Sequence, residues 1–336
     1  MGQLLEVERL KVTFQNGGER LVSVDDVSFS LSEGETVAIV GESGCGKSVT
    51  SLAIMGLLGA NGSIAEGDIR LGGQSIAACG DEQLRELRGN EMAMIFQEPM
   101  TSLNPVIPVG EQIEESIRLH LKLRRREAKK RAVDLLRKVG IPRPEAAARQ
   151  YPHSLSGGMQ QRVMIAMALA CSPKLLIADE PTTALDVTIQ AQILGLMKQL
   201  QAESGAAILL VTHDLGVVAE MADRVIVMYA GQVVESGDVY TLFKEPKHPY
   251  TQGLMRSVPR LDLERRRRLP SIPGTVPPLA QMPVGCRFHP RCPFADARCA
   301  SELPPLVAAG DEGLVRCWAA ADERVSQQRL PQEVTA

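Results

Sequence analysis

The stretch GESGCGKS at residues 41–48 decides the fold class of this 336-residue chain. It fits the pattern G-x-x-x-x-G-K-[ST], follows the apolar run TVAIV (36–40) and opens the helical pattern KSVTSLAIMGLL (47–58). A loop of this kind wraps a polyphosphate, because its glycines permit the turn and its backbone N–H groups and the helix N-terminus attract anionic oxygens. The sequence therefore predicts a phosphate-binding loop in an α/β domain.

The rest of the chain fits one large α/β domain with an appendage. LLIAD (175–179) and AAILLVT (206–212) are short, continuous apolar runs, as expected of parallel strands that are buried on both faces. Residues 186–205 are predicted to form one helix that begins after Asp186 and ends at Gly205. A charged helical subdomain, at about 99–157 and including the helical run 110–140, is expected as an insertion in this domain.

After about residue 240 the chain becomes proline-rich, which indicates an irregular extension over 241–336. The α/β domain is therefore predicted over 1–240. We expect the phosphate-binding loop to belong to a core that folds separately from the extension, so that nucleotide binding would persist if the tail from about residue 280 onward were loosened.

Composition excludes several classes of protein. The chain is 44% hydrophobic and 23% charged with a formal net charge of −3, so it is globular and has no overall attraction for nucleic acid. The basic runs RRREAKKR (124–131) and RRRR (265–268) are interpreted as solvated surface. No apolar run approaches the roughly 18 residues that span a bilayer, and the N-terminus lacks a signal-peptide pattern. We expect a soluble cytoplasmic chain.

The loop residues have predictable roles toward a bound nucleotide. Lys47 is expected to bridge the β- and γ-phosphates, and the hydroxyl of Ser48 is expected to ligate Mg²⁺. The full set of loop contacts that we expect is Gly41, Ser43, Gly44, Cys45, Gly46, Lys47, Ser48 and Val49.

Two further strands end in residues suited to phosphate chemistry. LLIAD ends in Asp179, which is expected to hold Mg²⁺, and Glu180 follows as a candidate base that accepts a proton from the attacking water. His213, in VTHD (211–214), would face the same γ-phosphate. A single histidine is more often structural, but its place at a strand end favours a catalytic role.

LSGGMQQR at 155–162 follows the helical insert and resembles the signature motif of ABC-transporter ATPases. The phosphate-binding loop occurs in the same family. Phe14, Gln97 in IFQEP and the segment TALD (183–186) match further motifs of that family in the same order. The resemblance implies a P-loop NTPase of the ABC type, with the inserted helical subdomain and an antiparallel β subdomain. It also implies that Phe14 stacks on adenine and that Gln97 lies at the Mg²⁺ site and at a hinge.

In that family the signature motif completes the nucleotide site of a second subunit. Ser156, Gly157 and Gly158 are thus expected to contact ATP held by another chain, in a head-to-tail dimer. Met159 departs from the commonest signature, which has glutamine there, but Ser156 and the glycine pair remain.

Other segments resemble the ATP-binding subunits of dipeptide and oligopeptide importers: EPMTSLNP (98–105), KHPYT (247–251), LPSIPGTVP (269–277) and the cysteine-containing tail. This resemblance implies a second, similar ATPase chain, two permease subunits, an extracytoplasmic solute-binding protein and a location at the cytoplasmic face of the inner membrane. Two alternatives are a soluble ABC ATPase of translation or DNA repair, and a catalytically silent regulatory subunit. The first usually has two cassettes or a long coiled coil, and the second is disfavoured by Glu180 and His213.

Four of the seven cysteines lie in the tail, at Cys286, Cys292, Cys299 and Cys317. Disulfides are not expected in a cytoplasmic chain, and the spacings lack the C-x₂-C pairs usual for structural zinc. Four thiolates, one of them followed by proline, suit a [4Fe–4S] cluster, and the resemblance to peptide importers implies the same. Zinc and plain or redox-active thiols remain alternatives. His289 is a candidate only as a substitute ligand. The other cysteines are predicted to be ordinary small residues: Cys45, Cys79 and Cys171.

Overall fold

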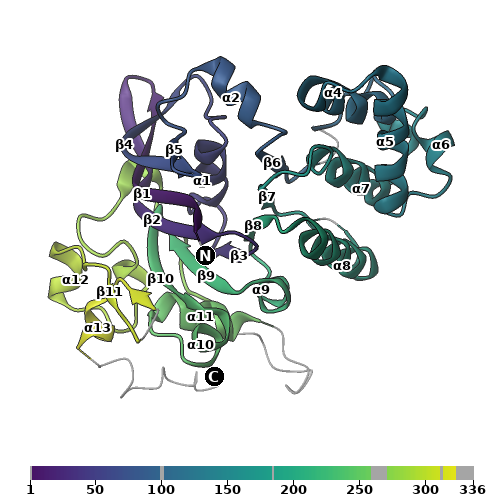
Figure 1. The fold of residues 1–336 in the computed structure, drawn as a ribbon. Coiled ribbons are helices and arrows are strands. Elements are labelled where there is room, and N and C mark those ends of the chain that lie inside the picture. The colour runs from purple at the N-terminus through teal and green to yellow at the C-terminus, as the bar shows by residue number, and fades with distance from the viewer. Residues whose placement is uncertain (1, 99–101, 184, 259–270, 311–312, 323–336) are drawn as a thin grey trace.

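The computed structural model describes residues 2–98, 102–183, 185–258, 271–310 and 313–322 of the chain. Within these ranges the strands form two sheets with helices around them (Figure 1). Some predicted segments lie wholly or partly outside the described residues: 99–101 of EPMTSLNP, 184 of TALD, 265–268 with the run RRRR, and 269–270 of LPSIPGTVP.

The larger sheet has eight strands in the order β11-β12-β10-β9-β3-β8-β7-β6. Its central pairs, β9 with β3, β3 with β8, β8 with β7 and β7 with β6, are parallel, and the remaining pairs are antiparallel. The bounds are β3 Thr36–Val40, β6 Met92–Ile95, β7 Leu175–Asp179, β8 Ala207–Thr212, β9 Arg224–Tyr229, β10 Gln232–Asp238, β11 Val307–Ala308 and β12 Leu314–Val315. The three strands predicted from apolar runs are confirmed, in β3, β7 and β8.

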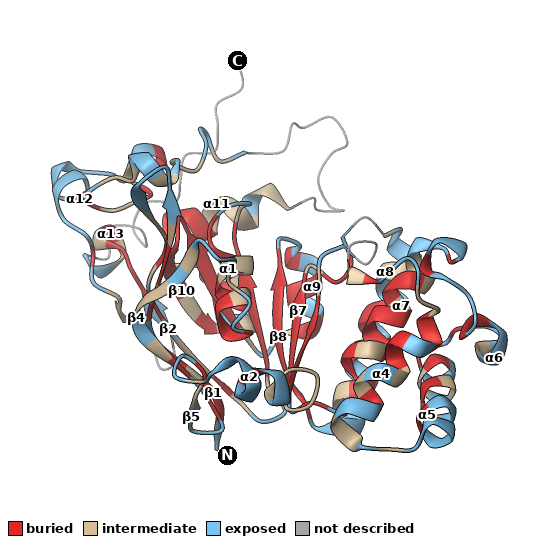
Figure 2. Ribbon diagram, turned by 90° about the horizontal axis from the view of Figure 1, so that it is seen from above, coloured by how far each residue is buried: buried red, intermediate tan, exposed pale blue. Residues whose placement is uncertain are grey.

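This sheet is covered on both faces, which explains why its central strands are continuously apolar. Successive side chains of a strand point to opposite faces. In β3, Val37 and Ile39 pack in one buried cluster, whereas Ala38 and Val40 pack in another. Figure 2 shows these strands as the buried centre of the molecule.

One face is covered by helix α1 and by a four-stranded antiparallel sheet with the order β2-β1-β4-β5. The bounds are β1 Gln3–Asn16, β2 Glu19–Ser32, β4 Gly62–Leu71, β5 Gln74–Ser75 and α1 Lys47–Ile54. The predicted helix 47–58 ends early, because the chain turns at Gly56 with φ +63°.

Between β6 and β7 the described residues are helical and project from the edge of the large sheet (Figure 1). The bounds are α4 Val109–Leu121, α5 Arg125–Lys138, α6 Pro144–Ala147, the 3₁₀ turn η1 Pro152–Ser154 and α7 Gly157–Ala168. The helical character predicted for 110–140 is confirmed, and the stretch forms two helices, because Lys122 adopts a left-handed φ of +53°. Glu127 then accepts a hydrogen bond from the Arg124 backbone N–H and starts the second helix.

The remaining helices described before residue 239 are α2 Asp81–Leu87, α8 Val187–Ser204 and α9 Leu215–Met221. The helix predicted at 186–205 is confirmed as α8. Asp186 caps its first turn by accepting from the Ile189 N–H at 2.9 Å, and Gly205 ends it in a left-handed conformation. No helix within the described ranges is long and apolar enough to cross a membrane.

The C-terminal extension is more regular than predicted. Its elements are α10 Val239–Lys244, α11 Pro249–Ser257, η2 Leu279–Gln281, η3 His289–Arg291, α12 Ala297–Ser301, α13 Trp318–Ala321 and the strands β11 and β12. The prediction of a merely irregular region is wrong, because β12 pairs with β10 through Glu235 and Val315 and adds to the large sheet. These short strands pair only through tertiary contacts, which apolar periodicity does not reveal.

Substitutions on α4 should separate buried from exposed positions of the helical subdomain. Ile113 is 0% exposed and belongs to the main core. Ile113→Ala should lower the free energy of unfolding by about 2–5 kcal/mol, because it leaves a cavity. Leu119, on the same helix, is 56% exposed, so Leu119→Ala should change the free energy of unfolding by less than about 0.5 kcal/mol. Urea unfolding followed by circular dichroism measures both, and equal effects would contradict the packing described for α4.

Candidate nucleotide-binding site

The phosphate-binding loop runs from the end of β3 to the start of α1 and is tightly seated on β9. A Cβ added to Gly41 would lie 2.2 Å from the Met228 carbonyl oxygen, so no other residue fits there. Gly46 precedes α1 with φ +101°, in the left-handed region that favours glycine. These two glycines hold the loop close to the sheet and direct its backbone toward the N-terminus of α1.

Within the loop, Ser43 and Gly44 are exposed, whereas Cys45 is buried, which raises the pKa of its thiol. Lys47 is also buried, and its Nζ donates to the carbonyl oxygens of Gly41 at 2.7 Å and Glu42 at 3.1 Å. The ammonium therefore lies across the loop, where it could pass from carbonyl to phosphate oxygens. Ser48 and Val49 are half-buried.

Two oxygen ligands suited to a hard cation lie side by side below the loop. The Ser48 hydroxyl donates to Asp179 Oδ1 at 3.1 Å, and Asp179 is the last residue of β7. Burial raises the pKa of Asp179 by more than the Ser48 hydrogen bond lowers it. A buried carboxylate beside a hydroxyl fits Mg²⁺, because the cation would stabilise the ionised form that burial disfavours.

Glu180 is held by three side chains from separate segments. Its carboxylate accepts from Gln97 Nε2 at 2.9 Å and Thr183 Oγ1 at 2.9 Å, and lies 3.1 Å from His213 Nδ1. Burial raises its pKa, but the hydrogen bonds from His213 and Thr183 outweigh burial and leave the pKa below its usual range. The neighbouring carboxylates Asp179 and Glu180 are thus shifted in opposite directions, as is common where two acids take different chemical roles.

The backbone of Glu180 is also unusual. Its φ is +47°, a left-handed conformation that costs a non-glycine residue about 1–3 kcal/mol. The Glu180 N–H donates to the Val211 carbonyl at 2.8 Å, which ties this turn to β8. The sheet therefore maintains a strained turn that places the carboxylate beside the loop.

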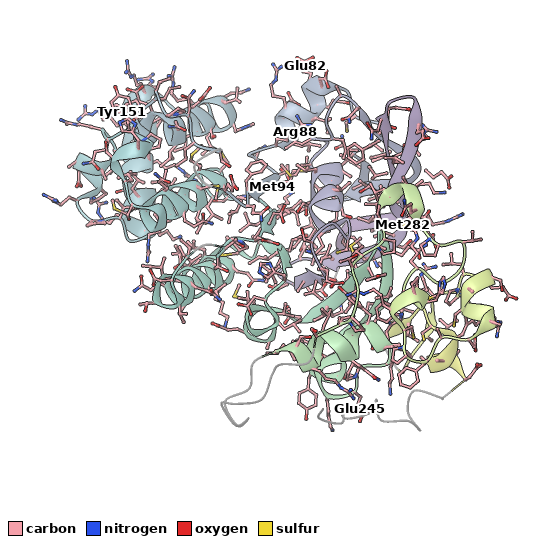
Figure 3. All side chains as sticks on the ribbon, turned by 180° about the vertical axis from the view of Figure 1, so that it is seen from behind. Glu82, Arg88, Met94, Tyr151, Glu245 and Met282 are labelled. Carbon is pink, nitrogen blue, oxygen red and sulfur yellow. The ribbon has the colours of Figure 1, made fainter. Side chains whose placement is uncertain are left out.

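A cavity of about 610 Å³ opens beside Ser48 and Asp179. Gln97 and Met94 also line it, and Figure 3 shows Met94 in the middle of the molecule. The complete lining is Ser48, Leu52, Met94, Phe96, Gln97, Glu98, Ser102 and Asp179.

Some predicted site residues lie elsewhere in the chain. Ser156 caps α7 by accepting from the Met159 N–H at 3.4 Å, and Ser156 and Gly157 are exposed. Figures 1 and 2 show α7 well apart from α1, so this motif does not approach the loop of its own chain. Phe14 lies on β1, half-buried, opposite Gly62 of β4.

The sequence analysis did not predict three contacts of the site. Thr183 donates to Glu180, and two residues of the extension, Arg291 and Tyr250, contact the loop. Arg291 forms an ion pair with the Glu42 carboxylate, and the Tyr250 hydroxyl accepts from the Glu42 N–H. The expectation that the extension is separate from the loop is therefore wrong. The partners are 249 and 208 residues apart in sequence, and no local pattern links them.

The four tail cysteines lie near one another. The Cys286 N–H donates to the Cys299 carbonyl at 2.8 Å, and Cys317 packs in a small cluster with Phe294, two residues after Cys292. Burial, with the neighbouring cysteines, raises the pKa of Cys292 to about 12 and that of Cys317 to about 11. All seven cysteines are described, and none forms a disulfide.

This cysteine set does not reach the spacing of a metal site. Among the residues that the structure describes, no group of three or more His, Cys, Asp or Glu side chains is arranged to hold a metal ion. Protonated thiols pack as small apolar groups, so the four cysteines can lie close together without being arranged as metal ligands. The predicted [4Fe–4S] cluster and its zinc alternative are thus unsupported by this arrangement.

Comparison with known families covers both parts of the chain. Residues 24–183 match the ABC transporter family, and residues 234–299 match the family described as oligopeptide/dipeptide transporter, C-terminal region. A putative peptide import ATP-binding protein of Brucella abortus is 55% identical, with 94% of this chain and 96% of the relative covered. The oligopeptide transport ATP-binding protein AppD of Bacillus subtilis is 54% identical, with 97% and 100% covered. The dipeptide transport ATP-binding protein DppD of Escherichia coli is 51% identical, with 95% and 98% covered.

Solved structures agree with these matches. The dimeric ATP-binding cassette MJ0796, in a post-hydrolysis state bound to ADP and Pi, is 30% identical with a TM-score of 0.64, and covers 70% of this chain and 99% of its own. The cbiO1 subunit of Clostridium perfringens is also 30% identical, with a TM-score of 0.62, and covers 73% of this chain and 92% of its own. The chain therefore belongs to the ABC transporter family and carries the C-terminal region of its oligopeptide/dipeptide transporters.

Proposed function

We propose that this chain is the ATP-hydrolysing subunit that powers import of dipeptides, oligopeptides or peptide-like solutes through a membrane ABC transporter. The observation that carries the proposal is the match of the whole chain, ATPase domain and extension together, to peptide import ATP-binding proteins. A soluble ABC ATPase would share only the ATPase domain and not the C-terminal extension.

ATP is held by the loop between β3 and α1. Lys47 transfers its hydrogen bonds from the loop carbonyls to the β- and γ-phosphates, and the N–H groups of the loop surround the phosphate oxygens. Ser48, Asp179 and Gln97 would hold Mg²⁺, which would supply positive charge against the phosphates. Phe14 stacks on the adenine.

Glu180 is the base for the water that attacks the γ-phosphate. Its low pKa keeps it ionised near neutral pH, and Gln97, Thr183 and His213 fix the direction of its carboxylate. Gln97 donates to the carboxylate from the end of β6, where the helical subdomain begins, so a movement of that subdomain would reach Glu180 directly. His213 orients Glu180 and faces the γ-phosphate.

The signature motif, Ser156 to Gly158, of which Ser156 and Gly157 are exposed, completes the nucleotide site of a second, similar ATPase chain in a head-to-tail heterodimer. The dimeric state of the related cassette MJ0796 supports such pairing. Two permease subunits bind the helical subdomains, and a solute-binding protein delivers the solute to the permeases. The chain lies at the cytoplasmic face of the inner membrane as a peripheral subunit.

The four tail cysteines are the place for a [4Fe–4S] cluster. They support it in number, in kind and in their nearness across three segments of the extension, although the described side chains are not arranged as metal ligands in this structure. A tetrathiolate zinc site is the alternative occupant.

Replacing the proposed base should stop hydrolysis without stopping binding. Glu180→Gln keeps the size of the side chain and one acceptor, so ATP affinity should stay within about threefold while turnover falls by about 10²–10⁴-fold. Steady-state phosphate release by the assembled transporter and ATP titration of the same preparation measure the two quantities. Undiminished phosphate release would exclude Glu180 as the base.

Removing the loop ammonium should weaken binding itself. Lys47→Ala leaves the β- and γ-phosphates without a positive partner in the ground state as well as in the transition state, so ATP affinity should fall at least about tenfold. Titration of the full chain with ATP and Mg²⁺ measures this. Lys198→Ala, which removes an exposed lysine of α8 that pairs with Glu220, is the control for charge alone. Equal affinity in Lys47→Ala and the unaltered chain would count against the loop assignment.

The cluster proposal is tested by metal content. Protein purified without oxygen should be brown, absorb near ~400 nm and contain about four irons per chain, and Cys292→Ser should lose this colour. Cys79→Ser, a half-buried cysteine outside the set, should keep it. Stoichiometric zinc without iron would replace the cluster by a zinc site, and metal-free protein with four titratable tail thiols would refute both.

A further inference from the structure

The second residue of the phosphate-binding loop, Glu42, is bound by an arginine of the C-terminal extension. Arg291, at the end of η3, donates from Nη1 to Glu42 Oε2 at 2.7 Å and from Nη2 to Oε1 at 3.0 Å. This is a two-point pairing of guanidinium with carboxylate, which fixes orientation as well as charge. The Glu42 carboxylate is therefore oriented by a group of the C-terminal extension.

Other groups hold Arg291 in this position independently of Glu42. Its Nε donates to the Pro273 carbonyl at 2.8 Å, and its remaining N–H groups reach the Tyr229 hydroxyl and the Ile272 carbonyl, both at 3.3 Å. The side chain is 4% exposed. The guanidinium is thus preorganised, and Glu42 binds to a rigid partner.

The backbone of Glu42 is fixed as well. Its N–H donates to the Tyr250 hydroxyl at 2.8 Å, and its carbonyl accepts from Lys47 at 3.1 Å. Tyr250 is fully buried and packs on Tyr229 and Phe288, with ring centroids 4.8 Å and 5.4 Å away. Two of the groups that fix Glu42 therefore belong to segments after residue 240.

The charge of Glu42 matters because it lies in a loop that binds a polyphosphate. An ionised carboxylate there repels phosphate oxygens unless a cation neutralises it, and at about a third exposed it is only partly screened by water. Without Arg291, Glu42 could also compete for Lys47. The pairing removes both effects.

We propose that Arg291 is a positioning residue through which the C-terminal extension sets the charge and shape of the phosphate-binding loop, and hence the affinity for nucleoside triphosphates. The inference rests on the ATP binding proposed above. Cys292 follows Arg291 directly, so displacement of the tail around the cysteines also displaces the partner of Glu42.

The test compares Arg291→Gln with the unaltered full chain by calorimetric titration with ATP and with ADP, in Mg²⁺ and low salt. ATP affinity should fall at least about tenfold, and ADP affinity should fall less, because ADP carries less charge toward the unpaired carboxylate. Arg316→Gln is the matched control. Arg316 belongs to the same extension, has a side chain 5% exposed and pairs with Asp26 instead of a loop residue. It should leave both affinities within about twofold.

The double variant Glu42→Gln with Arg291→Gln distinguishes lost charge pairing from misfolding. With no carboxylate left to repel phosphate, ATP affinity should return to within about threefold of the unaltered chain. Unchanged ATP affinity in Arg291→Gln would overturn the inference. An equal loss of ATP affinity in Arg316→Gln would also overturn it, as would an ATP affinity that does not recover in the double variant. Failure of the unaltered chain to bind ATP would instead refute the proposed function.

Discussion

The parallel pairing of β3 with β8 and of β8 with β7 is the constraint on which the site depends. In this register Val40 lies beside Thr212, and Asp179 beside Val211. The residues that follow these positions are Gly41, His213 and Glu180, so three distant segments begin their loops at one edge of the sheet. The carboxyl ends of parallel strands are where such sheets bind ligands, because loops rather than side-chain layers surround that edge.

The site combines groups with opposite electrostatic requirements. Asp179 is buried, which favours its protonated form and makes a cation its best partner. Glu180 is kept ionised by its donors, and its strained backbone is tied to β8. Gln97, two residues after the end of β6, donates to the same carboxylate, so Glu180 contacts the segment that leads into the helical subdomain.

The extension belongs to the same structural unit as the site. Tyr229 of β9, Tyr250 and Phe288 form a buried aromatic group, with ring centroids 4.8–5.4 Å apart, between the sheet and the tail. Around it, Arg287, Arg291 and Arg316 each pair with a carboxylate of the first 42 residues. Because buried arginines require partners, removal of the tail would leave these interactions broken on both sides.

The sequence alone predicted the loop, the strands β3, β7 and β8, the helix α8 and the family, since these depend on local periodicity, capping and short motifs. It also selected Lys47, Ser48, Asp179, Glu180 and His213 as candidate site residues, whose roles stay predictions. It did not determine the break at Lys122, the pairing of β12 with β10, or the contacts of Arg291 and Tyr250 with Glu42. No local sequence pattern marks a left-handed backbone at a residue other than glycine, a strand of two residues, or an ion pair between residues that are 249 positions apart. Only the folded chain, which brings Tyr250 and Arg291 of the extension to Glu42 of the loop, decides them.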